Sequence, residues 1–282
     1  MSRIAYVNGR YLPHQNASVH IEDRGYQFSD GVYEVWHIAH GKLQDHAMHM
    51  QRLQRSLREL HIPFVPGTAA LDIILYEIIR RNRIQNGMVY LQITRGVAPR
   101  DHAWDEDIVP ALVITAKAIN PAQLASKAET GVSVATMPDE RWHRCDIKSV
   151  SLLPNVLAKQ QAKQQGAYEA WLLDEQGFVR EGSSTSAWIV TDKGELVTRQ
   201  LSNQILSGVT RMALLQLAEK RQLKVTERKF SLQEAQSASE AFLSSATTIV
   251  MPVTRIDGVK IGDGKPGAVA KLLRQAYLTA LQ

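Results

Sequence analysis

One lysine and one arginine–histidine pair are residues that could take part in catalysis or ligand binding. Lys148 lies in a loop ahead of a predicted helix. A lysine amine that is partly desolvated and deprotonated forms a Schiff base with a carbonyl group. The pattern around Lys148, taken alone, favours an ordinary surface lysine beside Asp146. Arg100 and His102 alternate along a segment that, if extended, places both side chains on one face. The pair suits a carboxylate ligand, and the alternative is two solvated loop residues.

A phosphate-binding arrangement is indicated where another predicted helix begins. Ser207-Gly208-Val209-Thr210 leads into a helix predicted over 209–221. The free N–H groups at the start of a helix bind phosphate well. Arg52 lies on a helix predicted over 47–61, and the pattern there, taken alone, favours an ion pair on the helix surface.

Two sets of elements must position these residues. The N-terminal patterns predict an Asn8-Gly9 hairpin turn and a short strand after His40-Gly41. They also predict strands at 4–7, 10–12, 32–38, 88–94 and 111–117, and helices over 47–61 and 69–82. Residues 120–130, which include Pro121, are interpreted as a linker. The patterns beyond it predict strands at 132–136, 168–173, 186–191, 223–229 and 240–245, and helices over 154–165, 209–221, 231–238 and from 267 to the end.

The mixed order of strands and helices favours two α+β domains over a doubly wound parallel sheet. We expect a small N-terminal domain of residues 1–119 and a larger C-terminal domain of residues 131–282 that holds Lys148 and Glu181.

Composition limits the class of protein. The chain has 282 residues, of which 44% are hydrophobic and 22% are charged. This composition excludes a disordered or fibrous protein. A single cysteine, Cys145, excludes an intrachain disulfide framework. The N-terminus lacks a signal-peptide pattern and no apolar run is long enough for a membrane span, so we expect a cytoplasmic protein with no membrane partner. The net charge of +5 is carried partly by arginines on helical patterns, which favours solvated helix faces over a nucleic-acid track.

Three short motifs do not support a site. Gly262-Asp-Gly264-Lys-Pro-Gly267 matches a dinucleotide fingerprint, but too little chain follows it for the strand and acidic residue that such a site needs. His46-x-x-His49 lacks an evident third ligand, so no metal is expected. The serines at 183, 184 and 186 are not set in a G-x-S-x-G nucleophile elbow.

Five segments, taken in order, carry a family likeness. They are Glu22-Asp-Arg-Gly-Tyr-Gln-Phe-Ser-Asp-Gly-Val-Tyr-Glu34, Thr94-Arg-Gly-Val-Ala-Pro-Arg-Asp-His102, Arg144-Cys-Asp-Ile-Lys-Ser149, Glu181-Gly-Ser-Ser-Thr185 and Leu206-Ser-Gly-Val-Thr-Arg211. Together they resemble the fold-type IV family of pyridoxal-phosphate enzymes, and within it the D-amino-acid transaminases. The likeness covers essentially the whole chain.

The resemblance implies the cofactor pyridoxal 5'-phosphate and a role for each matching residue. Lys148 would hold the cofactor as a Schiff base and shuttle the proton at the substrate Cα. Glu181 would pair with the pyridine nitrogen and keep it protonated, where the alternative is an exposed glutamate. The phosphate would be bound by Arg52, Val209, Thr210 and Thr247, and Leu206, otherwise plain core, would pack on the ring. Ala246 departs from the family pattern, since relatives often carry Thr there.

The resemblance also implies the substrate and the assembly. Tyr33, Arg100 and His102 would trap the substrate carboxylate, with Ser184 nearby, and Arg100 and His102 would come from the partner subunit of a homodimer. The implied reaction is ping-pong transamination between a D-amino acid, such as D-alanine or D-glutamate, and a 2-oxo acid, such as 2-oxoglutarate or pyruvate.

Rival functions stay open. A branched-chain L-amino-acid transaminase, an (R)-amine transaminase or an aminodeoxychorismate lyase would share Lys148 and Glu181, and Arg100-x-His102 favours the D-amino-acid branch over them. A remote alternative is a non-catalytic binding protein that uses the positive net charge to bind a cofactor or nucleic acid.

Overall fold

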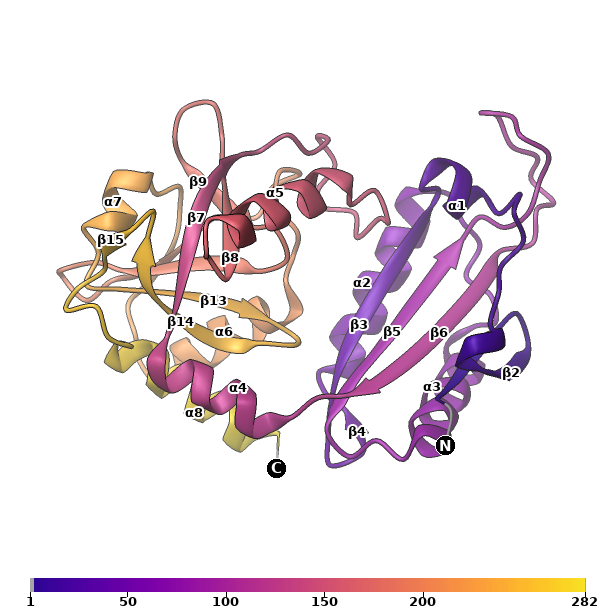
Figure 1. The fold of residues 1–282 in the computed structure, drawn as a ribbon, viewed down its shortest axis with the longest axis horizontal. Helices are drawn as coiled ribbons and strands as arrows, with labels where there is room; N and C mark the ends of the chain where they lie inside the picture. Colours follow the sequence, from indigo (N-terminus) through magenta and orange to yellow (C-terminus); the bar gives the residue numbers. More distant parts are fainter. Residues whose placement is uncertain (1–2, 282) are drawn as a thin grey trace. The chain divides into compact units, whose positions relative to one another are not determined.

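The computed structural model describes residues 3–281, which form two compact units of mixed helix and sheet (Figure 1). The first unit comprises the chain up to Asn120 together with Ile147–Ser151. The second comprises Pro121–Asp146 and the chain from Leu152 onwards. No helix within the described residues is long and apolar enough to cross a membrane.

The first unit is built on a six-stranded sheet in the order β2-β1-β6-β5-β3-β4. Its strands are β1 (Ile4–Val7), β2 (Arg10–Pro13), β3 (Gly31–Ala39), β4 (Lys42–Leu43), β5 (Gly87–Thr94) and β6 (Ala111–Ala118). Its helices are the 3-10 helix η1 (His14–Asn16), α1 (Arg24–Phe28), α2 (His46–Glu59) and α3 (Thr68–Asn82). The predicted hairpin is confirmed, because β1 pairs with β2 and both turn residues have positive φ.

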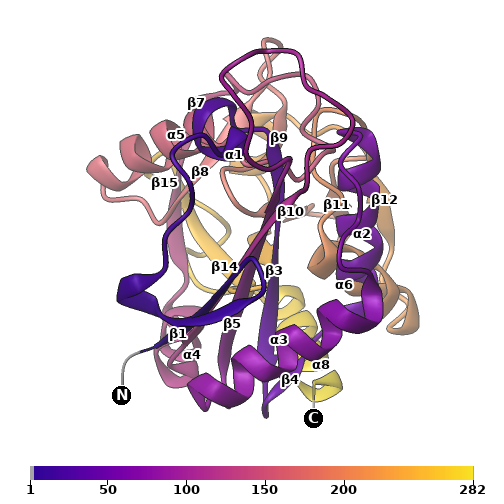
Figure 2. The same ribbon diagram turned by 90° about the vertical axis from the view of Figure 1, so that its right-hand side faces the viewer.

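Two helices bury one face of this sheet. Helix α2 contacts β3, and α3 contacts β1 and β6 (Figure 2). Leu53 of α2 and Leu75 of α3 share one apolar cluster with Trp36 of β3. Because side chains alternate along a strand, β3 presents Glu34 and Trp36 to the helices and Tyr33 to the other face.

The segment that carries Lys148 pairs with the edge of this sheet. The Tyr33 N–H donates to the Lys148 carbonyl at 3.0 Å, and the Val150 N–H donates to the Gly31 carbonyl at 3.0 Å. This backbone pairing groups Lys148 with the first unit, whereas the sequence-based boundary placed it in the C-terminal domain.

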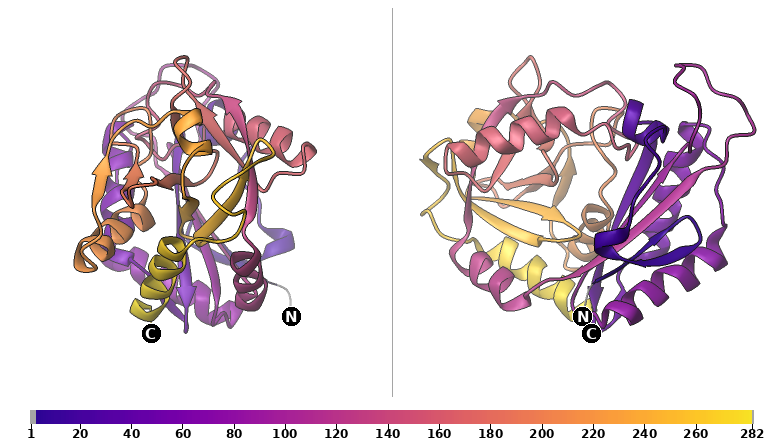
Figure 3. Two further views of the ribbon diagram at one scale, coloured as in Figure 1. Left: turned by 90° about the vertical axis from the view of Figure 1, so that its left-hand side faces the viewer. Right: turned by 45° about the vertical axis from the view of Figure 1, so that its right-hand side comes forward.

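The second unit is built on a nine-stranded sheet in the order β12-β11-β10-β13-β14-β7-β8-β9, with β15 beside β14. Its strands are β7 (Val132–Pro138), β8 (Glu169–Leu173), β9 (Val179–Gly182), β10 (Ser186–Val190), β11 (Leu196–Thr198), β12 (Val225–Glu227), β13 (Glu240–Ser245), β14 (Ile249–Ile256) and β15 (Val259–Lys260). Its helices are α4 (Pro121–Thr130), α5 (Leu153–Gln164), α6 (Val209–Lys220), α7 (Leu232–Gln236) and α8 (Ala268–Ala280). Helices α6 and α8 contact each other and β13 (Figure 3).

Several parts of the second unit differ from the sequence-based prediction, which omits the short strands β11 and β15 and differs most at α4 and β14. The residues interpreted as a linker form helix α4, which begins at Pro121, a position where proline's missing N–H costs nothing. The prediction also omits β14, whose apolar run is interrupted by Pro252. Pro252 is tolerated because β14 pairs with β7 only from Val253 onwards. The last helix was predicted to reach residue 282, which lies outside the described residues.

Candidate active site

Lys148 and Tyr33 lie together in the first unit. The Lys148 amine is half-buried and sits 4.0 Å from the centroid of the Tyr33 ring. The backbone N–H of Lys148 donates to the hydroxyl of Ser56 on α2 at 3.2 Å, and the preceding Ile147 is buried in the core. Within residues 3–281 no carboxylate forms an ion pair with this amine. The surroundings are therefore those of a positioned and partly desolvated amine, not of a surface lysine paired with Asp146.

Arg100 and His102 lie in an exposed loop that a buried arginine holds in place. The Arg24 guanidinium donates to the carbonyl oxygens of Asp101 at 2.6 Å and His102 at 3.0 Å. The segment bends, so the extended geometry that would place the two side chains on one face is not present. The two side chains nevertheless meet at one ring, since Arg100 Cζ lies 4.6 Å and the His102 ring 5.5 Å from the centroid of Phe28.

Arg52 is engaged by a carboxylate that the sequence-based site did not include. Its Nε and Nη2 donate to the two oxygens of Glu34 at 2.9 and 2.6 Å, and His49 Nδ1 lies 2.9 Å from the same carboxylate. Burial alone would raise the pKa of Glu34, but Arg52 and His49 outweigh it and hold that pKa well below its ordinary value. The pair is buried, so Arg52 does not form an ion pair on the helix surface.

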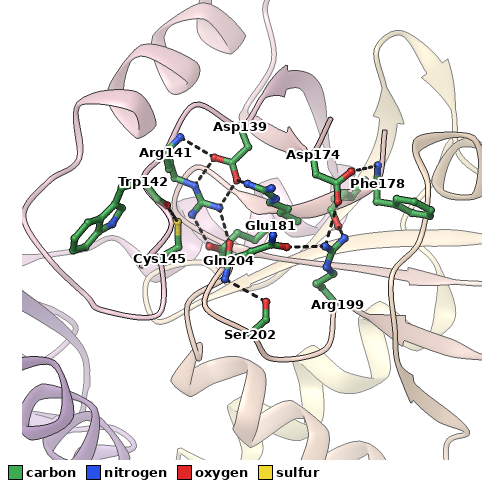
Figure 4. A network of polar contacts seen from close by, with 12 residues as sticks. Asp139, Arg141, Trp142, Cys145, Asp174, Phe178, Glu181, Arg199, Ser202 and Gln204 are labelled. Carbon is green, nitrogen blue, oxygen red and sulfur yellow. Dashed lines mark hydrogen bonds and ion pairs between the residues drawn. The ribbon is translucent and has the colours of Figure 1, made fainter. Parts of the chain in front are cut away.

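Glu181 stands at the centre of a buried network in the second unit, near the end of β9 (Figure 4). Its Oε1 accepts from Arg141 Nη1 at 2.6 Å and from the Leu206 N–H at 3.1 Å. Burial raises the pKa of Glu181, and Arg141 opposes that rise. Leu206 is therefore adjacent to Glu181. The family resemblance implies that Leu206 packs on the cofactor ring and that Glu181 pairs with the nitrogen of the same ring.

Arg141 and Asp139 are the residues that sequence reasoning missed here. Arg141 donates to Asp139 through Nε and Nη2, both at 2.9 Å, while Arg180 Nη1 donates to the same carboxylate at 2.9 Å. Burial would raise the pKa of Asp139, but the two guanidinium groups lower it overall. No motif marks Asp139-x-Arg141 in the sequence, because its partner Glu181 is distant along the chain.

The start of α6 has the features of an anion site. Gly208 caps the helix without a side-chain hydrogen bond, and the first N–H groups of a helix have no acceptor within it. The Thr210 hydroxyl is buried and has no hydrogen-bond partner among residues 3–281. Thr247, in the turn between β13 and β14, is half-buried beside Ser245, with their hydroxyl oxygens 3.4 Å apart. A phosphate would satisfy the Thr210 hydroxyl and these N–H groups together.

Ser184 belongs to a turn that a buried glutamate organises. Its hydroxyl donates to Glu169 Oε2 at 2.8 Å, the hydroxyl of Ser183 donates to Oε1 at 2.5 Å, and Lys159 Nζ lies 3.1 Å from Oε1. These serine hydroxyl groups therefore donate to a buried carboxylate and tie the turn to β8.

The comparisons with known proteins identify the family. Residues 31–256 match the family model described as amino-transferase class IV. A D-alanine aminotransferase of Bacillus licheniformis is 40% identical over 274 residues, which cover 97% of this chain and 95% of that protein. The chain belongs to the class IV aminotransferase family, and it is an aminotransferase.

Solved structures show the same fold. A branched-chain amino acid aminotransferase of Escherichia coli superposes with a TM-score of 0.91 at 23% identity, over 100% of this chain and 95% of that one. The PLP-bound form of a hypothetical aminotransferase from Mycobacterium tuberculosis gives a TM-score of 0.84 at 20% identity, over 99% of this chain and 98% of that one. The predicted α+β, fold-type IV architecture is confirmed.

Proposed function

We propose that this aminotransferase exchanges the amino group between a D-amino acid of the D-alanine or D-glutamate type and a 2-oxo acid, in a ping-pong sequence. The observation that carries this proposal is the 40% identity with a D-alanine aminotransferase over 97% of the chain. The placement of Arg100 and His102 around one ring supports it, because a guanidinium and an imidazole side by side suit a carboxylate.

The proposed cofactor is pyridoxal 5'-phosphate. When bound, its protonated pyridine ring accepts electron density from the substrate Cα as the proton there is removed. The unsatisfied Thr210 hydroxyl and the start of α6 fit a phosphate, and Val209, Thr210, Thr247 and Arg52 are the residues proposed to hold it. Arg52 already donates hydrogen bonds to Glu34. In the proposed role its guanidinium contacts both this carboxylate and the phosphate.

Lys148 is proposed to anchor the cofactor and to move the proton at the substrate Cα. Its half-buried side chain against the Tyr33 ring supports this role, because the contact holds the amine in a defined place. Glu181 is proposed to hold a proton on the pyridine nitrogen, and Leu206 to pack on the ring.

Arg100, His102 and Tyr33 are proposed to bind the substrate carboxylate, with Ser184 nearby. We further propose a homodimer in which Arg100 and His102 serve the partner's site. Both side chains are exposed in the single chain, so they are available to a second copy.

A product assay tests the proposed function. The purified protein, supplied with pyridoxal phosphate, D-alanine and 2-oxoglutarate, is expected to form pyruvate and D-glutamate in equal amounts, measured by chiral chromatography. L-Leucine or an (R)-amine as the better donor would instead support the branched-chain or amine alternatives. Pyruvate formed from aminodeoxychorismate without any acceptor would support the lyase.

A further inference from the structure

Arg141 contacts Glu181 directly and lies outside every site that the sequence predicted. We propose that Arg141 is a positioning residue, which keeps the Glu181 carboxylate ionised and fixes its orientation for a protonated pyridine nitrogen. The inference rests on the proposed function, because it explains how a buried Glu181 can carry the charge that this function requires.

The guanidinium of Arg141 is held rigidly. Its Nε and Nη2 donate to Asp139, its Nη1 donates to Glu181, and its Nη2 also lies 3.2 Å from the Gln204 carbonyl (Figure 4). Only 8% of the side chain is exposed, so water cannot replace these contacts. Because a guanidinium is planar, a plane fixed by Asp139 also fixes the direction from which Glu181 is approached.

The two oxygens of Glu181 are treated differently. Oε1 takes the Arg141 Nη1 donor at 2.6 Å and the Leu206 N–H at 3.1 Å. Oε2 has a longer contact, 3.3 Å, with the Leu206 N–H, and no other hydrogen bond with the described residues. The network therefore saturates one oxygen and leaves the other able to accept a further charged donor.

Among the charged groups near Glu181, Arg141 does most to lower the pKa of its carboxyl group. Burial and the Asp139 carboxylate both raise the pKa of Glu181, while Arg141 lowers it. Cys145 contributes no competing charge at neutral pH, because burial raises the pKa of its thiol to about 11. Arg180 contacts Asp139 and not Glu181. Without Arg141, only the Leu206 N–H still favours the ionised form, while burial and Asp139 favour the protonated carboxyl, which cannot stabilise a pyridinium ion.

The experiment compares Arg141→Gln with a matched control. Arg180→Gln removes a guanidinium from the same Asp139 carboxylate but leaves the contact between Arg141 and Glu181 in place. Glu181→Gln serves as the reference for a lost carboxylate. Each variant is loaded with pyridoxal phosphate labelled with 15N in the ring, and the 15N chemical shift reports whether the nitrogen is protonated. The rate of the half-reaction with D-alanine is then followed from pH 5 to 9.

Arg141→Gln is expected to move the ring 15N signal toward that of Glu181→Gln. Because Glu181 must be deprotonated to act, a raised pKa moves the acid limb of the rate profile upward, by about one to three pH units. The rate at pH 7 should fall roughly tenfold or more, with recovery at high pH. Arg180→Gln should keep both the 15N signal and the acid limb of the parent.

An unchanged 15N signal and acid limb in Arg141→Gln would overturn the inference while the proposed function stood. A parent protein that fails to react with D-alanine would instead remove the proposed function, and the 15N comparison among the loaded variants would still decide the role of Arg141. Should Arg141→Gln not fold, Arg141→Lys carries the test. A lysine keeps the positive charge but lacks the planar fork that bridges Asp139 and Glu181, so the acid limb should move upward by less than in Arg141→Gln, and an unchanged limb and 15N signal would contradict the account.

Discussion

The buried Glu34–Arg52–His49 cluster gives a residue-scale prediction about stability. Glu34→Gln removes the carboxylate that compensates the Arg52 charge in a buried site, so the free energy of unfolding should fall by about 3–5 kcal/mol. Urea denaturation of the cofactor-free protein measures this loss. Glu77→Gln is the matched control, because Glu77 pairs with Arg80 at the helix surface in the same unit and its loss should leave unfolding unchanged within error. Equal losses in the two variants would refute the distinction.

At this scale the sequence predicts single residues better than their partners. The family resemblance in the sequence singles out Lys148, and the structure adds the Tyr33 ring beside its amine. The sequence does predict that His49 and Arg52, three residues apart on a helix, share one face, but not that Glu34 of β3 joins them. Nor could Arg141 be found from the sequence, because only folding brings β9 to the loop after β7.

At the scale of the element, the start of α6 separates cofactor binding from stability. Thr210→Val removes a buried hydroxyl that has no partner within residues 3–281, so the cofactor-free protein should be as stable as the parent or more so. Affinity for pyridoxal phosphate should fall roughly tenfold to a hundredfold, because a hydrogen bond to a charged group is lost. Fluorescence titration and thermal unfolding measure the two effects.

Thr198→Val is the control for this prediction. The Thr198 hydroxyl is also buried, but it donates to the Ala187 carbonyl at 2.9 Å, so its loss should lower stability and leave cofactor affinity unaltered. If Thr210→Val destabilised the cofactor-free protein and bound the cofactor normally, the hydroxyl would be a structural group and not a phosphate ligand.

Elements with strong local patterns could be predicted from the sequence, and elements that depend on distant pairing could not. Helices α2 and α3 and the first hairpin follow from periodicity and turn residues within a few positions. Strand β14 depends on β13 and β7, which pair with it across the sheet and accommodate Pro252. Tertiary pairing there overrides the local signal.

At the scale of the whole molecule, the proposed site residues divide between the two units. Lys148, Tyr33 and Arg100 belong to the first unit, and Glu181 and Thr210 to the second. The residues on both sides of Ile147–Ser151 belong to the second unit, but this segment, which includes Lys148, pairs with β3 of the first unit. A local sequence pattern cannot predict this pairing, because it carries no information about which distant strand a segment will join.

Complementation between two inactive variants tests the proposed dimer. Lys148→Ala lacks the proposed proton carrier, and Arg100→Ala lacks the proposed carboxylate ligand. If Arg100 serves the partner's site, one site in each mixed dimer is intact, so unfolding and refolding the two variants together should restore about a quarter of the parent activity. If Arg100 serves its own subunit, every site in the mixture lacks one residue and no activity should return.

The absorption spectrum of the purified protein with pyridoxal phosphate, recorded before and after D-alanine and in parallel with L-alanine, tests the central claim most directly. The account predicts a yellow band in the parent protein that bleaches with D-alanine alone, and no such band in Lys148→Ala. Bleaching with L-alanine instead would contradict the assignment of D-amino acids. A parent protein that shows no band after incubation with pyridoxal phosphate would contradict the cofactor and the roles given to Lys148 and Glu181.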